Sequence, residues 1–223
     1  MNVMTKPQPR SLAKNFEALK RYERGPVTDD YVLIRDVMVP MRDGVRLATD
    51  IYLPAKDGKP LPGRFPAILD RTPYDKIPRA WLANDPEFFA RRGYAFVFQD
   101  SRGHGGSEGE FSIYVDEGRD GYDTVEWIAR QDWCNGDVGT SGYSYDAATQ
   151  NALAREAPPH LKAMFPAFGT SNYHNDCEGH GGAFPLPTIS TTRCTMPRWT
   201  GARGTIRRLR PPFTRRGSSS PHG

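Results

Sequence analysis

Residues 138–157 read VGTSGYSYDAATQNALAREA and contain the strongest local signal in the sequence. Residues 138–143 have the length of a strand, and residues 145–157 have the composition of a helix. Ser144 stands where the two predicted elements meet. The free backbone N–H groups and the positive end of a helix that begins there stabilise negative charge next to this serine.

A nucleophilic serine needs a sharp turn between strand and helix, with small neighbours that allow the two elements to approach closely. Gly142 and Ala147 are such neighbours, whereas Asp146 stands where the common Gly-x-Ser-x-Gly pattern has its second glycine. The alternative is that Ser144 only caps the helix, which is a frequent use of serine. The strand before it and the helix after it favour the nucleophile.

The chain on both sides of this turn alternates predicted strands and helices. It begins with a hairpin, because apolar residues alternate over 31–39 and 45–53 around an Asp-Gly turn. Further strands are predicted at 65–70, 94–98 and 161–165, and helices at 86–92 and 116–133. This order predicts an α/β fold with a mostly parallel sheet.

A second motif, RTPYDK at 71–76, follows one of these predicted strands. Acyl transfer needs two hydrogen-bond donors aimed at the oxyanion, and the loop after this strand commonly supplies one of them. The Tyr74 hydroxyl could be that donor, or the Tyr74 ring could lie buried beneath the loop. The sequence leaves both interpretations open.

The glycines in DSRGHGGSEG, residues 100–109, superficially suggest a loop that binds a dinucleotide. In a dinucleotide loop the glycines open a helix, whereas EFSIYV follows here. We therefore expect a structural turn and no cofactor. Asp100 and Arg102 are expected to form a local ion pair near the pocket rather than to act as catalysts.

Residues 174–180, HNDCEGH, contain five possible metal ligands but lack the paired spacing of zinc sites. We expect no metal there and interpret the segment as part of a cap over the pocket, which begins at about 170–184. The three cysteines lie far apart in the chain and are expected to be reduced. They are Cys134, Cys177 and Cys194.

The formal net charge of +4 is unevenly distributed over the 223 residues. Residues 185–223 contain eight Arg and no Lys, Asp or Glu and carry +8, whereas residues 1–184 carry −4. The segment 185–223 shows no helical or strand period, so we expect it to be unstructured. Its composition is typical of a GC-rich gene translated in a shifted reading frame. The net positive charge of the whole chain therefore does not indicate that its partner is a nucleic acid.

Targeting signals are not apparent in the sequence. It has no run of 18 apolar residues, and residues 1–20 carry charges throughout instead of the apolar stretch of a signal peptide. We expect no membrane association and a cytoplasmic location. Residues 1–30 are predicted to be a loosely attached arm, and nothing in the sequence indicates the oligomeric state.

Five motifs together resemble those of a known family. In chain order they are MRDGVRLATDIYLP at 41–54, RTPYD at 71–75, DSRGHGGSEG at 100–109, GYDTVEWI at 121–128 and GYSYDA at 142–147. Over residues 31–184 the chain resembles the cocaine-esterase and X-prolyl dipeptidyl-peptidase family of α/β-hydrolases, which also includes α-amino acid ester hydrolases and cephalosporin acylases. The resemblance implies an α/β-hydrolase core over 31–184 that is incomplete at its C-terminal side.

The resemblance also implies roles for three residues of this chain. Ser144 would be the acylated nucleophile, and the Tyr74 hydroxyl with the Tyr145 backbone N–H would form the oxyanion hole. The implied substrate is a small molecule with an ester or amide bond, and no cofactor or metal is implied.

The family's remaining catalytic residues are an Asp and a His that lie well downstream, after a helical cap. The histidines that follow Ser144 are His160, His174, His180 and His222, and none lies in a segment resembling the family's catalytic loop. A serine hydroxyl is a poor nucleophile without an oriented base. The alternative to an active serine hydrolase is therefore a catalytically inactive, truncated hydrolase or a binding module.

Overall fold

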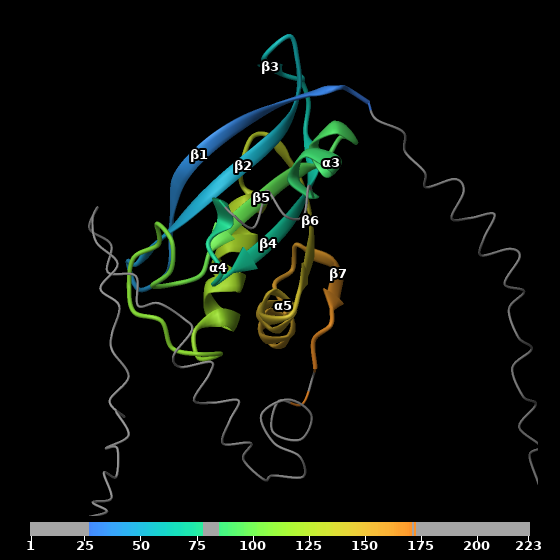
Figure 1. Cartoon of the computed structure of the whole chain (residues 1–223). Coiled ribbons are helices and arrows are strands. Elements are labelled where there is room, and N and C mark those ends of the chain that lie inside the picture. Colours follow the sequence, from blue (N-terminus) through green and yellow to red (C-terminus); the bar gives the residue numbers. More distant parts are fainter. Residues whose placement is uncertain (1–26, 78–84, 171, 173–223) are drawn as a thin grey trace, which may run out of the picture.

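The computed structural model describes residues 27–77, 85–170 and 172 and shows a mixed β-sheet flanked by helices (Figure 1). Along the sheet the strands follow the order β1-β2-β5-β4-β6-β7, and β3 pairs with β2. The elements are β1 (Asp30–Pro40), β2 (Arg46–Lys56), β3 (Lys59–Pro60), β4 (Phe65–Thr72), α3 (Asp85–Arg91), β5 (Ala95–Asp100), α4 (Glu117–Ala129), β6 (Cys134–Tyr143), α5 (Tyr145–Glu156) and β7 (Leu161–Ala167).

Four strands, β5, β4, β6 and β7, are parallel to one another, as expected of an α/β fold. The predicted hairpin is also confirmed, since β1 and β2 pair in antiparallel and β2 joins β5 in antiparallel. Because the carboxyl ends of parallel strands meet at one edge of a sheet, the residues that follow β4, β5 and β6 gather at that edge. Both candidate motifs, RTPYDK and GYSYDA, lie there.

Residues 56–60 form a second hairpin that the sequence analysis missed. Lys56 pairs with Lys59 across the two-residue turn formed by Asp57 and Gly58. These two residues have φ of 52° and 71°, the backbone conformation that a tight turn between twisted strands requires. Strand β3 was overlooked because it is only two residues long.

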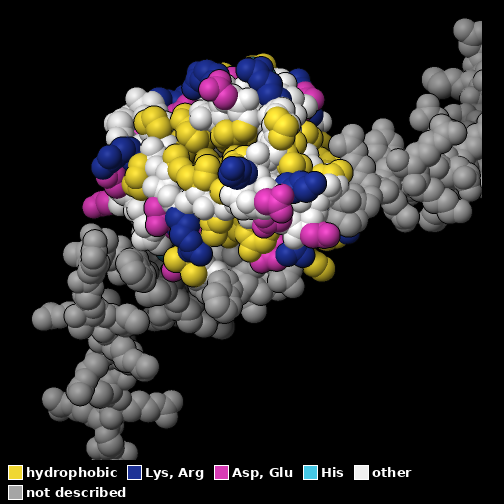
Figure 2. Space-filling view, turned by 90° about the horizontal axis from the view of Figure 1, so that it is seen from above, with side chains coloured by type: hydrophobic (Ala, Val, Ile, Leu, Met, Phe, Trp, Pro, Cys, Tyr) yellow, Lys and Arg dark blue, Asp and Glu magenta, His cyan; other side chains and the backbone are white. Residues whose placement is uncertain are grey.

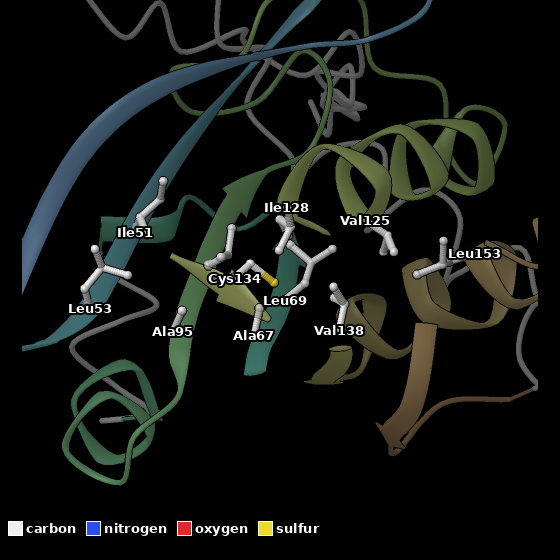
Figure 3. Close-up of a cluster of buried hydrophobic side chains, with 11 residues drawn as sticks. Ile51, Leu53, Ala67, Leu69, Ala95, Val125, Ile128, Cys134, Val138 and Leu153 are labelled. Carbon is white, nitrogen blue, oxygen red and sulfur yellow. The ribbon is translucent and has the colours of Figure 1, made fainter. Parts of the chain in front are cut away.

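Helices cover both faces of the sheet. Strand β5 carries apolar side chains on both of its faces, and each set must be buried against a helix. Ala95 and Val97 belong to the cluster that packs beneath α4 and α5, which also includes Leu69, Val125 and Leu153 (Figure 3). Phe96 and Phe98, at the alternate positions, pack with Ala90 of α3 on the opposite face. The continuous apolar run predicted at 94–98 is thus a strand buried on both sides.

Helix α4 ends four residues before the predicted boundary at 133. The backbone N–H groups of Arg130 and Gln131 donate to carbonyls of the last turn, at Trp127 and Ile128. The Trp133 carbonyl instead accepts a hydrogen bond of 2.8 Å from the Phe65 N–H. The chain leaves the helix early because residue 133 is already attached to the first residue of β4.

The loop that follows β5 is a structural turn, as expected. The prediction of an ion pair between Asp100 and Arg102 within it is wrong. Arg102 pairs with Asp120 and Asp43, each at 2.7 Å. Asp100 is fully buried and instead lies 3.4 Å from the Lys76 ammonium. Arg102 is bound by carboxylates outside the loop, so the two neighbours in sequence belong to different ion clusters.

The surface of the described part is mixed in character. Figure 2 shows hydrophobic side chains gathered over much of the face seen from above, with charged side chains among and around them. None of the helices that the structure describes has the length and apolar character needed to cross a membrane. Residues 1–26, the segment 174–180 and the tail 185–223 lie outside the described residues.

Candidate active site

Ser144 lies at the carboxyl edge of the sheet, between the last residue of β6 and the first of α5. It is exposed, and its backbone has φ of 60° and ψ of −122°. A residue with a side chain adopts a positive φ only under strain, at a cost on the order of 1–3 kcal/mol. This strained turn presents the serine side chain at the end of the strand, as the sequence analysis expected of a nucleophile.

Small residues around Ser144 are required by close contacts. Gly142 has φ of 153°, and a Cβ at this position would lie 2.6 Å from the Asp146 Cβ. Ala147 is fully buried, and a Cβ on Gly169 would lie 2.6 Å from the Ala147 Cβ. The expected need for Gly142 and Ala147 is therefore met, and Gly169 is a third small residue that sequence reasoning missed.

Gln150 fixes the strand-to-helix turn from beneath. Its side-chain amide is buried, and its oxygen accepts a hydrogen bond of 2.8 Å from the Thr140 hydroxyl of β6. Its nitrogen faces the backbone carbonyls of Gly142 at 3.3 Å, Asp146 at 3.2 Å and Phe165 at 3.3 Å. One side chain of α5 thus connects β6, its own helix and β7 directly below the serine.

Tyr74 is brought next to Ser144 although 70 residues separate them in sequence. The Tyr74 hydroxyl lies 3.3 Å from the Ser144 Oγ, within hydrogen-bonding distance. The Tyr74 side chain is 41% exposed, which excludes the alternative of an aromatic ring buried beneath the loop. The hydroxyl is available to a group bound at the serine.

Tyr145 is the first residue of α5, so its backbone N–H is one of those that a helix leaves without an intrahelical acceptor. Its side chain is buried and stacks on Tyr114, with ring centroids 4.9 Å apart. The Tyr145 hydroxyl accepts a hydrogen bond of 3.1 Å from the Tyr114 N–H. Burial, together with the nearby Glu117 carboxylate, raises the pKa of Tyr145. The side chain is thus a neutral anchor that fixes the start of the helix.

Neither described histidine forms a hydrogen bond with Ser144. His160 precedes β7 and lies at the amino edge of the sheet, where its carbonyl accepts from Val138 N–H and its Nδ1 lies 3.0 Å from Glu126. Ser144 lies at the other end of β7, because its N–H donates to the carbonyl of Ala167. Seven strand residues at about 3.3 Å each place the two roughly 20 Å apart.

His104 is buried in the loop after β5. Its ring makes an edge contact with Phe111, with centroids 4.2 Å apart. Burial lowers the pKa of His104, so its neutral form is favoured. His174 and His180 lie outside the described residues, as does His222.

The RTPYDK loop is held at both ends by buried cations that the sequence analysis did not single out. Before Tyr74, the Arg71 guanidinium is buried and lies 2.9 Å from the Glu117 carboxylate. After it, the Lys76 ammonium lies among carboxylates of β1, β2 and β5. The available signal was the presence of two basic residues in a motif that directly follows a buried strand.

Other candidate sites are not supported in the described part of the chain. Its His, Cys, Asp and Glu residues form no group of three or more that could hold a metal ion. A cavity of about 370 Å³ lies between α3 and strands β4, β6 and β7. Neither Ser144 nor Tyr74 is among the described residues that line it, so it is separate from the serine.

Several known proteins with a similar sequence or structure are named as hydrolases. Cocaine esterase from Rhodococcus sp. (strain MB1 Bresler) is 42% identical over 167 residues, which cover 73% of this chain and 28% of that protein. A CocE/NonD family hydrolase from Staphylococcus aureus is 34% identical with a TM-score of 0.59, covering 67% of this chain and 30% of that chain. An α-amino acid ester hydrolase is 30% identical with a TM-score of 0.58, covering 81% and 31%.

This chain therefore spans less than a third of the length of each of these relatives. The residue range matched by a family sequence model contains both the RTPYDK loop and the serine turn. The sequence model of the X-Pro dipeptidyl-peptidase (S15 family) matches residues 43–207, and the chain belongs to this family of α/β-hydrolases.

Proposed function

We propose that this chain carries the nucleophile of a serine hydrolase, which cleaves an ester or amide bond through an acyl-enzyme on Ser144. The observation that carries the proposal is the strained, exposed position of Ser144 with its Oγ 3.3 Å from the Tyr74 hydroxyl. A serine that only capped α5 would accept a hydrogen bond from the first turn, and the Ser144 side chain makes no such bond.

In the proposed reaction the Ser144 Oγ forms a bond to the substrate carbonyl carbon, and the carbonyl oxygen becomes negatively charged. The Tyr74 hydroxyl and the Tyr145 backbone N–H donate hydrogen bonds to this oxyanion. Removal of one such donor typically slows the reaction by about 10²–10³. The bond to the leaving alcohol or amine then breaks, and water later hydrolyses the acyl group from the serine.

The proton of the Ser144 hydroxyl needs an acceptor, and an oriented histidine has this role in most serine hydrolases. Of the two described histidines, His160 lies at the far edge of the sheet and His104 is buried against Phe111. The proposal therefore assigns the nucleophile and the oxyanion donors to this part of the chain and leaves the base to residues outside it.

The proposed substrates are small molecules with an ester or amide bond. Three relatives support this class by their names: cocaine esterase, an α-amino acid ester hydrolase and, at 27% identity over 111 residues, Xaa-Pro dipeptidyl-peptidase from Lactobacillus helveticus. The shared chemistry is attack on an acyl carbon.

Hydrolysis of p-nitrophenyl acetate tests the proposal, because this activated ester needs little help from a base. We expect an initial release of p-nitrophenol that Ser144→Ala abolishes. Ser141→Ala is the matched control, since Ser141 lies three residues earlier on β6, and it should keep the release. Equal release by the wild type and Ser144→Ala would contradict the proposal.

A binding module without acylation is the second candidate. The position of His160 at the opposite edge of the sheet favours it, because the described part then contains a serine without a hydrogen-bonded histidine. Such a module would bind an ester without cleaving it, so Ser144→Ala would change neither binding nor the slow background release of p-nitrophenol.

A further inference from the structure

We propose that Lys76 is a positioning residue, which holds the Tyr74 hydroxyl at Ser144 by anchoring the loop between them in a buried cluster of carboxylates. The proposal rests on the proposed function, because it assigns Lys76 a part in forming the oxyanion hole. Lys76 itself lies two residues after Tyr74, and its polar contacts are with Asp36, Asp50 and Asp100.

Lys76 is attached to the body of the protein by both its side chain and its backbone. Its side chain is only 3% exposed, and its Nζ lies 2.7 Å from Asp36 of β1, 3.5 Å from Asp50 of β2 and 3.4 Å from Asp100 of β5. Its backbone N–H donates a hydrogen bond of 2.7 Å to the other oxygen of Asp100. Three strands thus converge on one residue of the loop.

Asp100 is in turn fixed by the loop that follows β5. Its Oδ2 accepts a hydrogen bond of 3.0 Å from the Gly106 N–H. A Cβ on Gly105 would lie 2.1 Å from this oxygen, so the loop packs directly on the carboxylate. Asp100 is fully buried and therefore provides Lys76 with a rigid attachment point.

Tyr74 depends on these attachments because its own side chain is 41% exposed and so has limited packing. On the other side of Tyr74, the Thr72 carbonyl accepts a hydrogen bond of 2.8 Å from the Ser101 N–H, and the Tyr74 N–H donates to the Thr72 hydroxyl at 3.2 Å. The loop is therefore fixed before Tyr74 by Thr72 and after it by Lys76. Release of either end would allow the hydroxyl to move away from the serine.

The cluster places three carboxylates around one ammonium group. Burial would lower the pKa of Lys76, but its hydrogen bond to Asp36 and the charges of Asp100 and Asp50 outweigh this effect and raise the pKa. Lys76 is thus a permanent cation, and its removal would leave buried carboxylates without their counter-charge, which is strongly unfavourable. A neutral side chain cannot replace it.

Hydrogen exchange of the peptide covering 72–77 tests the anchoring independently of any activity. In Lys76→Met, if it folds, we expect exchange in this peptide at least about tenfold faster than in the wild type, with peptide 145–153 of α5 unchanged. Asp36→Asn is the milder variant, because the Asp36 side chain is 65% exposed, and it should show a smaller change in the same direction. Unchanged exchange of 72–77 in the folded variants would overturn the proposal.

The rate at which a fluorophosphonate labels Ser144 tests the link to Tyr74. We expect Tyr74→Phe and Lys76→Met each to slow labelling by at least about tenfold, and the double variant to be no slower than Tyr74→Phe alone. Independent, multiplicative losses would overturn the positioning role. Arg102→Met is the matched control, because it also removes a largely buried cation. Any slowing of labelling that it causes should multiply with the slowing caused by Tyr74→Phe.

The two measurements separate the possible failures. A wild type that is not labelled contradicts the proposed function, and the exchange of peptide 72–77 then still decides whether Lys76 fixes the loop. A wild type labelled at Ser144, with normal exchange and labelling in Lys76→Met, leaves the proposed function intact and overturns the role of Lys76.

Discussion

Ser144 owes its position to its neighbours, which hold its backbone at φ of 60°. The surrounding structure must compensate this strain, and close packing is what maintains it. Gly142 permits the approach of α5 to β6, and Ala147 permits the approach of Gly169. The backbone geometry of Ser144 therefore depends on three small residues around it, which are Gly142, Ala147 and Gly169.

Gly142→Ala should destabilise the protein by about 1–3 kcal/mol, because the new methyl group would overlap Asp146 Cβ at 2.6 Å and Asp70 Oδ1 at 2.9 Å. Urea unfolding measures the loss. Gly139→Ala, on the same strand, is the control, since its methyl group would meet only carbonyl oxygens at 3.6 and 3.9 Å. Equal stability losses in the two variants would contradict the steric explanation.

His104 should make the stability of the protein depend on pH. Burial lowers its pKa below the ordinary value of 6.5, so the unfolded state binds more protons between the folded and unfolded pKa values. The stability contribution of neutral His104 is therefore fully present above pH 6.5 and decreases as the pH falls below it. Urea unfolding at pH 7.5 and 5.5 should show a larger loss in the wild type than in His104→Gln. An identical pH dependence in both proteins would contradict this assignment.

At the scale of elements, Gln150 joins α5 to β6 and β7. Its amide oxygen accepts a hydrogen bond from the buried Thr140 hydroxyl, and an unsatisfied buried polar group costs about 1–3 kcal/mol. The hydrogen bonds of the Gln150 side chain therefore contribute both to stability and to the position of the turn that carries Ser144.

Gln150→Met should lower the free energy of unfolding by about 1–3 kcal/mol, since methionine fills a similar volume without the hydrogen bonds. Thermal and urea unfolding provide the measurement. Gln131→Met is the control, because the Gln131 amide is only half-buried and bonds a single carbonyl, that of Trp127. If Gln150→Met lowers the free energy of unfolding no more than Gln131→Met does, the hydrogen bonds of Gln150 are unimportant for stability.

The order of elements could be predicted from sequence because each core strand is bounded by clear turn signals. The apolar run 94–98 and the Asp-Gly turn between 31–39 and 45–53 have direct structural counterparts in β5 and the β1–β2 hairpin. The end of α4 could not be predicted, since it depends on the hydrogen bond between Trp133 and Phe65 across the sheet. Long-range backbone pairing of this kind leaves no local pattern.

At the scale of the whole molecule, the site is assembled from distant parts of the chain. The parallel arrangement of β4, β5 and β6 brings Tyr74 to Ser144 and Lys76 to Asp100. The serine turn could be predicted from its own sequence, because small residues and the strand-to-helix change are local. The ion clusters could not, since the partners of Arg102 and Lys76 come from other strands and helices.

The central claim is that Ser144 is a nucleophile with an oxyanion hole beside it. Its most direct test is mass-spectrometric mapping of the chain after treatment with a fluorophosphonate, in protein shown to be folded by circular dichroism. We predict a single adduct on Ser144, absent in Ser144→Ala and formed about 10²–10³ times more slowly in Tyr74→Phe. An unlabelled folded protein, or an adduct on another residue, would contradict the account.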